Sequence, residues 1–163
     1  SVHTGASGTL TTALAIDNAG IVTKPLQPAF LAHASTQFNI PVNTTYTVLL
    51  QTENFDNNND FSSNTFTAPV TGKYQLNYHI YLVQMPTNAS YFETYLETSN
   101  RTYAGAVTPS SYGGGGINYI SISTSVLADM DAGDTAIVRM AQGGGTASTD
   151  INTNTYFSGF LVC

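Results

Sequence analysis

The chain has 163 residues, of which 42% are hydrophobic and 9% are charged, enough apolar content for one buried core. Four Lys and Arg residues against ten Asp and Glu residues give a net charge of -6, which disfavours binding to nucleic acid or to anionic membranes. No apolar run approaches the ~18 residues of a membrane span, and Cys163 has no intrachain partner, so this Thr-, Asn- and Ser-rich composition indicates an extracellular or virion-surface protein without disulfides.

The first 27 residues are small and polar, with several glycines and a threonine run. They predict an extended N-terminal arm or the end of a fibre shaft, and no separate domain. Pro25 and Pro28 stand at the end of this region, and two prolines three positions apart prevent a regular helix or a central strand from crossing it. We therefore place a boundary between an arm, residues 1–27, and a globular head, residues 28–163.

From residue 29 onward, the pattern predicts β-structure. Apolar and polar residues alternate over residues 74–83, and no segment carries a sustained helical stripe. The predicted strands cover residues 30–33, 46–50, 74–83, 91–96, 102–107, 117–127, 135–141 and 156–162. Gly-, Asn-, Asp- and Pro-rich turns separate them, so the chain is expected to be all-β, an antiparallel sandwich or jelly roll.

Two segments also carry a family resemblance. The first is the order Leu50, Asp56, Phe61, Phe66, Gly72, Tyr74, Leu76 and Tyr78. It resembles the signature of the globular head of complement C1q, in the C1q/TNF jelly-roll superfamily, and Ser158-Gly-Phe-Leu-Val162 is similar to that family's last strand. The resemblance spans about residues 28–162. The chain departs from the family in a shorter gap between Phe61 and Phe66, in Leu76 at a common Phe position, and in lacking internal cysteines.

The resemblance implies a homotrimer in which one sheet of each jelly roll faces the three-fold axis. The residues are consistent with this arrangement, because the strand at 74–83 has Tyr81 and Val83 on its nominally polar face. Such residues are unfavourable on a sheet face exposed to water, which indicates that this face is covered. The alternative is that Tyr81 is an ordinary surface aromatic. The predicted interface residues are His79, Tyr81, Tyr156 and Phe160.

The sequence offers little chemistry. His3, His33 and His79 are scattered, and we interpret the last two as interface or core residues. Glu93 and Glu97 lie four apart, which puts them roughly 13 Å from each other on a strand, too far for a glycosidase pair. No hydrolase, zinc-protease, nucleotide or dinucleotide motif occurs, so we predict that the protein is not an enzyme.

Calcium is the one metal that the sequence raises. Asp129, Asp131 and Asp134 form an acidic turn with possible oxygen ligands, although such turns are more often solvated hairpins. The family's calcium position precedes the strand near Ile117, and Gly113-Gly-Gly-Gly116 there provides no carboxylate. We expect no cofactor, with calcium as the remaining alternative.

Polar loops are the candidate recognition surface. Residues 52–64, 85–91, 109–119 and 142–154 are rich in Tyr, Asn, Ser and Gly, a mixture typical of antibody loops, although it also serves solubility alone. The candidate ligand-binding residues are Tyr91, Tyr112, Tyr119, Asn88 and Asn154. Asn43, Asn88 and Asn100 begin glycosylation sequons, which matter only in a eukaryotic secretory protein.

The arm suggests a context. It has no Gly-X-Y repeat or heptads, and Ile16-Asp-Asn-Ala-Gly-Ile-Val-Thr-Lys-Pro25 resembles the lead-in of C1q-like heads in phage tail fibres. The sequence therefore favours a non-catalytic, trimeric receptor-binding or adhesion head of a virion fibre or appendage, recognising a host surface glycan or protein. The alternatives are a structural virion decoration, a self-assembling extracellular fibre subunit that donates its arm, or a secreted C1q-domain lectin.

Overall fold

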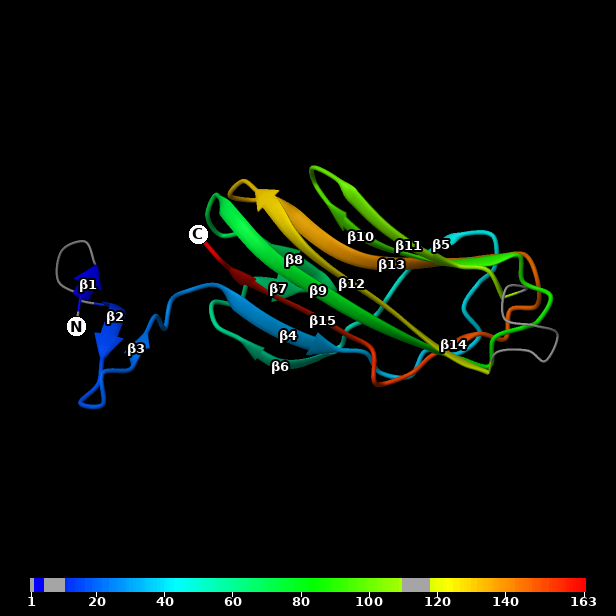
Figure 1. The fold of residues 1–163 in the computed structure, drawn as a ribbon, viewed down its shortest axis with the longest axis horizontal. Helices are drawn as coiled ribbons and strands as arrows, with labels where there is room; N and C mark the ends of the chain where they lie inside the picture. Colours follow the sequence, from blue (N-terminus) through cyan, green and yellow to red (C-terminus); the bar gives the residue numbers. More distant parts are fainter. Residues whose placement is uncertain (1, 5–10, 110–117) are drawn as a thin grey trace.

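The structure is a computed structural model that describes residues 2–4, 11–109 and 118–163 (Figure 1). These residues form β-strands and no α-helix, and none of their segments is a helix that could cross a membrane. Two sheets pack face to face as a sandwich, and every pairing between strands is antiparallel. The expected all-β antiparallel sandwich is therefore confirmed.

We call the two layers sheet I and sheet II. Sheet I contains, in spatial order, β12 (Tyr119–Met130), β9 (Gly72–Val83), β15 (Tyr156–Leu161), β4 (Ala29–His33) and β6 (Thr52–Asp56), with β14 (Asp150–Ile151) also paired to β9. Sheet II contains β11 (Thr102–Val107), β10 (Tyr91–Thr98), β13 (Thr135–Gly143), β8 (Thr65–Thr67) and β7 (Phe61–Ser62), with β5 (Thr45–Thr47) also paired to β13. Neighbours in space are mostly distant in sequence, as in a jelly roll.

The core lies between the sheets and is built by alternation. The even-numbered residues of β9 from Tyr74 to Leu82 are fully buried, while the intervening residues point to the outer side of sheet I. Phe30 stacks against Phe66 at 4.7 Å between ring centroids. The hydroxyl of Tyr78 bonds to Thr94 at 2.7 Å across the sandwich, so the buried phenol is paired, as such groups must be.

The residues that carry the family resemblance have specific local tasks. Asp56 accepts hydrogen bonds from the backbone N–H of Asp60 and Phe61, which closes the turn after β6. Ser63 and Asn64 both have positive φ, so β7 and β8 are joined by a two-residue turn of the kind that Asn tolerates. This tight turn explains why the gap between Phe61 and Phe66 is short.

The predicted strands are all present within a few residues, but the three strands of the arm and four strands of the head were not predicted. The four in the head are β6, β7, β8 and β14, which are short or exposed and therefore lack a readable alternation. The prediction that residues 52–64 form a recognition loop is wrong. They contain β6 and β7, and the turn at residues 57–60 lies at the arm end of the sandwich, away from the loops at residues 85–91 and 142–154 (Figure 1).

The arm is more ordered than the sequence suggested. β1 (Val2–Thr4), β2 (Thr11–Ile16) and β3 (Val22–Thr23) form a small antiparallel sheet beyond the end of the sandwich where the C-terminus lies (Figure 1). The following segment is tied to the sandwich. Asn58 Nδ2 donates to the carbonyl of Leu26 at 3.1 Å, and the backbone N–H of Leu161 donates to the carbonyl of Pro28 at 3.0 Å.

Gly159 on β15 predicts a clear stability effect. A Cβ at this position would lie 2.6 Å from Leu76 Cδ2 and 2.8 Å from Phe30 Cε1, closer than atoms can pack. We expect Gly159→Ala to lower the free energy of unfolding by about 1–3 kcal/mol through overpacking. Ser158→Ala on the same strand, facing outward, is the control and should stay within about 0.5 kcal/mol of the wild type. Equal stability of the two variants in urea unfolding would contradict this account.

Candidate functional site

The outer face of sheet I is an uncovered surface made of cross-strand rows. The strand register aligns its outward residues across β12, β9, β15 and β4. From the arm end, the rows are Leu127, Gln75, Phe160 and Ala29; Ser125, Asn77, Ser158 and Leu31; Ser123, His79, Tyr156 and His33; and Ser121 with Tyr81. Leu127 is 57% exposed, Phe160 46% and Phe55 on the neighbouring β6 49%. An apolar strip therefore crosses the face near the arm end.

This face carries no Asp, Glu, Lys or Arg in the four rows, and its polar groups are largely satisfied within the sheet. Gln75 Nε2 donates to Ser125 Oγ at 2.9 Å, and that hydroxyl donates to Asn77 Oδ1 at 2.8 Å. His79 Nδ1 bonds to Ser123 Oγ at 2.8 Å. Because these bonds are internal, another surface can cover the face without leaving many polar atoms unpaired, and low charge is typical of the centre of interfaces.

All four predicted interface residues lie on this face. The ring of His79 stacks on Tyr156 with centroids 5.3 Å apart, and Tyr81 stacks on Tyr119 at 6.2 Å. Tyr119, which we predicted to bind ligand, thus belongs to the sheet I surface and not to a loop. Sequence reasoning missed Leu31, Phe55 and Leu127. The alternation of inward and outward residues along β12 and β4 could have placed Leu127 and Leu31 on this face. Phe55 could not be placed in this way, because β6 was not recognised as a strand.

The other predicted ligand residues gather at the end of the sandwich opposite the arm. Asn88 Oδ1 accepts from the backbone N–H of Thr146 at 3.3 Å, which joins the loop after β9 to the loop after β13. Tyr91 begins β10 next to that loop, and Asn154 is exposed in the turn before β15. Tyr112 lies outside the described residues. The described candidates share one end, but Tyr91 faces out from sheet II and Tyr119 from sheet I.

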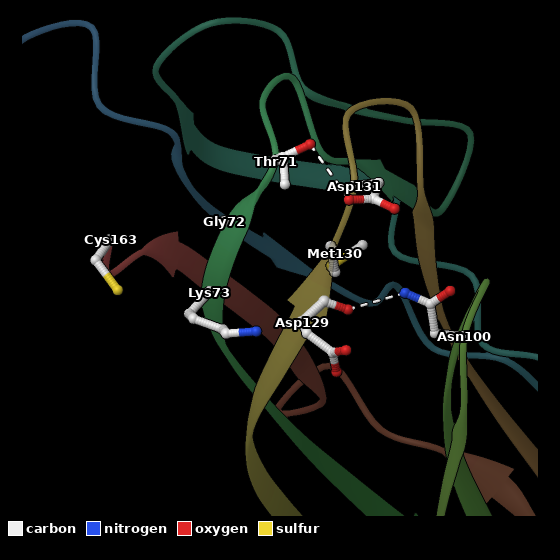
Figure 2. A pocket seen from close by; sticks show the side chains of 8 residues that line it. All are labelled: Thr71, Gly72, Lys73, Asn100, Asp129, Met130, Asp131 and Cys163. Atoms are coloured by element: carbon white, nitrogen blue, oxygen red, sulfur yellow. Dashed lines mark hydrogen bonds between the residues drawn. The ribbon is translucent and has the colours of Figure 1, made fainter.

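Of the three predicted acidic residues, Asp129 and Asp131 line a hollow of about 390 Å³ at the arm end, and Asp134 does not (Figure 2). Their carboxylates have separate partners. Asp131 Oδ1 accepts from Thr71 Oγ1 at 3.3 Å, Asp134 Oδ2 accepts from Asn100 Nδ2 at 2.8 Å, and Asp129 lies 3.6 Å from the guanidinium of Arg101. Within residues 2–4, 11–109 and 118–163, no cluster of three or more His, Cys, Asp or Glu side chains could hold a metal ion. Asn43, Asn88 and Asn100, the three sequon residues, are all exposed.

The two glutamates of β10 serve different partners. Glu97 Oε2 is 3.1 Å from the guanidinium nitrogen of Arg139, and Glu93 accepts a short hydrogen bond from the hydroxyl of Tyr95. The hydrogen bond to Glu93, with some desolvation, raises the pKa of Tyr95 to about 12. The Tyr95 hydroxyl therefore stays protonated throughout the physiological range and acts as a fixed donor to Glu93.

Comparison with known proteins identifies the family. The C1q domain matches residues 29–162, which is most of the chain, so the protein belongs to the C1q domain family. No curated protein sequence matches the chain. The solved structures similar to it include the globular domain of zebrafish complement 1qA, with a TM-score of 0.62, 16% identity, and coverage of 84% of this chain and 98% of that one.

Structures of TNF relatives are similar in the same way. Eiger TNF from S. frugiperda has a TM-score of 0.62, 13% identity, and coverage of 84% of this chain and 93% of that one. Murine APRIL has a TM-score of 0.58, 10% identity, and coverage of 83% and 99%. At these identities the likeness shows the fold alone. C1q/TNF domains are generally non-enzymatic ligand-binding domains, usually extracellular, and typically assemble as trimers.

The hydrogen bond between Tyr95 and Glu93 predicts that the stability of the protein depends on pH in the alkaline range. Because the folded-state pKa of Tyr95 lies above the ordinary value near 10, the stability that this pair contributes is present below pH 10 and is lost as the pH rises through about 12. We expect Glu93→Ala to return the pKa of Tyr95 toward 10, measured from the Tyr95 Cζ chemical shift. A Tyr95 titration that still falls near 12 in this variant would show that Glu93 is not the cause.

Proposed function

We propose that the chain is a non-catalytic, trimeric receptor-binding or adhesion head of a virion fibre or appendage, which recognises a host surface glycan or protein. The observation that carries this proposal is the outer face of sheet I. A single sheet face with exposed leucine and phenylalanine, stacked aromatic rings and no charge in its central rows is suited to burial against other copies.

The positions of the arm, the C-terminus and the loops also support a trimer assembled through sheet I. The arm and the C-terminus lie at one end of the sandwich, and the loops after β9 and β13 lie at the other (Figure 1). When three copies meet through sheet I, three arms leave from one end and three sets of loops face away from it. Such a head presents its recognition loops at the tip while the arms continue toward whatever carries them. Three weak sites on a rigid trimer then act together with a much higher avidity.

A structural role is the second candidate, and the arm favours it. Ile16 and Ile21 are each 59% exposed and Val22 is 53% exposed, so the small arm sheet has an apolar surface that the sandwich leaves uncovered. A three-stranded sheet with uncovered apolar residues is a surface for further packing. A joint or decoration would use this surface to clamp neighbouring fibre proteins, and it would need no host ligand.

The trimer makes a direct prediction. Light scattering after size-exclusion chromatography should give three chain masses for the wild type, and Phe160→Asp should give one, because a carboxylate would be buried without a partner. Phe38→Asp is the matched control. Phe38 is 70% exposed in the loop between β4 and β5, so this variant should remain a trimer. A folded wild-type monomer, verified by circular dichroism, would overturn the proposed assembly.

Binding to cells separates adhesion from a structural role. The fluorescently labelled wild-type trimer should bind candidate host cells in a saturable way, and binding by the Phe160→Asp variant should fall by on the order of 100-fold, because the three linked sites are lost. A trimer that binds none of the candidate cells would contradict the adhesion proposal and favour the joint.

A further inference from the structure

Sheet II carries a hollow on its outer face that the sequence did not indicate. Its volume is about 240 Å³, and its lining includes Asn43, Thr45, Tyr91, Tyr95 and Ala141. The register explains how these residues meet. Thr45 of β5 pairs with Ala141 of β13, Ala141 pairs with Glu93 of β10, and the tyrosines flank Glu93 along that strand. Ala141 points outward yet is only 9% exposed, because the side chains on both sides stand over it.

The aromatic wall of the hollow is held in place. A Cβ on Gly143 would lie 2.2 Å from the Tyr91 ring, so the ring rests directly over this glycine. Tyr91 remains 40% exposed. Tyr95 is four residues further along the chain and points to the same face. Its hydroxyl is held by the hydrogen bond to Glu93. The two tyrosine side chains therefore line the hollow beside Ala141, and little conformational entropy is lost when a ligand packs against them.

The polar groups of the hollow divide into structural and available ones. Gln142 is fully used, since Nε2 donates to the carbonyls of Gly144 and Thr146 and Oε1 accepts from Thr149. Asn43 Oδ1 accepts from the backbone N–H of Gly144. Among the described residues, no protein partner engages Asn43 Nδ2 or the hydroxyls of Thr45 and Tyr91. Donors and acceptors thus surround an aromatic surface.

We propose that this hollow binds a single ring of a neutral sugar, as the terminal unit of a host glycan. The apolar C–H face of a pyranose packs on the face of a tyrosine ring, whose electron density is negative there. Its hydroxyls require nearby donors and acceptors, which the Asn43 amide and the hydroxyls of Thr45 and Tyr91 provide. The hollow is smaller than the roughly 300–1,000 Å³ of sites that bury drug-sized ligands, which limits it to one small unit.

Charge selects the kind of sugar. Glu93 lies between Tyr91 and Tyr95 on the outer face of β10 and pairs with Ala141, so its carboxylate is a neighbour of the hollow and not part of its lining. The nearest guanidinium on this strand pair, that of Arg139, is already engaged by Glu97. The whole chain carries a net charge of -6. A carboxylated or sulfated sugar would bring its anion next to an unneutralised carboxylate, which is unfavourable. Neutral hexoses and N-acetylhexosamines fit, whereas sialic and uronic acids do not. This inference rests on the proposed adhesion function and specifies its ligand.

The test is a titration of the ¹³C,¹⁵N-labelled trimer with glucose, galactose, mannose and N-acetylglucosamine, followed by NMR, with sialic acid and glucuronic acid in parallel. At least one neutral sugar should shift the resonances of Tyr91, Tyr95 and Thr45. Tyr91→Ala should weaken its binding about tenfold, and Tyr91→Phe, which keeps the ring, should weaken it less. Phe38→Ala removes an exposed aromatic ring outside the hollow and should leave the affinity unchanged.

The outcomes separate this inference from the function on which it rests. Shifts at other residues only, an unchanged affinity in Tyr91→Ala, or binding of the acidic sugars alone would overturn the neutral-sugar site. Cell binding that survives periodate oxidation of the cell-surface glycans and is lost after protease treatment would indicate a protein receptor. That result would overturn the sugar site while leaving the adhesion function in place. An absence of both sugar binding and cell binding would overturn both.

Discussion

The pairing of β9 with β12 along twelve residues is the constraint on which the rest of the structure depends. Since side chains alternate along a strand, this long register assigns every residue of β9 to one of two environments. The even-numbered residues build the core against sheet II. The odd-numbered ones, from Gln75 to Tyr81, become the centre of an exposed face. One register therefore defines both the stability of the sandwich and the surface through which it is proposed to assemble.

Much of this could be predicted from the sequence because β9 and β12 are long. The alternation along β9 indicated β-structure and placed His79 and Tyr81 on one face, whereas the position of Tyr156 beside His79 follows from the β15–β9 register. Short strands gave no comparable signal. β6 has five residues, four of them exposed, so its residues were mistaken for a loop. The hollow on sheet II could not be predicted either, because Asn43 and Tyr91 meet only through β13, which no sequence pattern connects to both.

The two sheets thus carry different tasks. Sheet I offers a face whose four central rows carry no charge and whose polar groups bond to one another, as suits a buried contact. Sheet II offers tyrosine rings and free hydrogen-bonding groups beside Ala141, as suits a ligand that must leave again. Because the two faces point in opposite directions, assembly through sheet I leaves the sheet II hollow open in every copy.

The attachment of the arm has a mechanical consequence. Residues 26–28 bond to the end of β15 and to the turn at residues 57–60, and the chain then continues into β4 along the long axis of the molecule (Figure 1). A pull on the arm is therefore directed along β4 and opposes the β4–β15 hydrogen bonds in parallel. Bonds loaded together in shear resist tension better than bonds that open one after another, so we expect the anchored end of the domain to resist a pull on the arm.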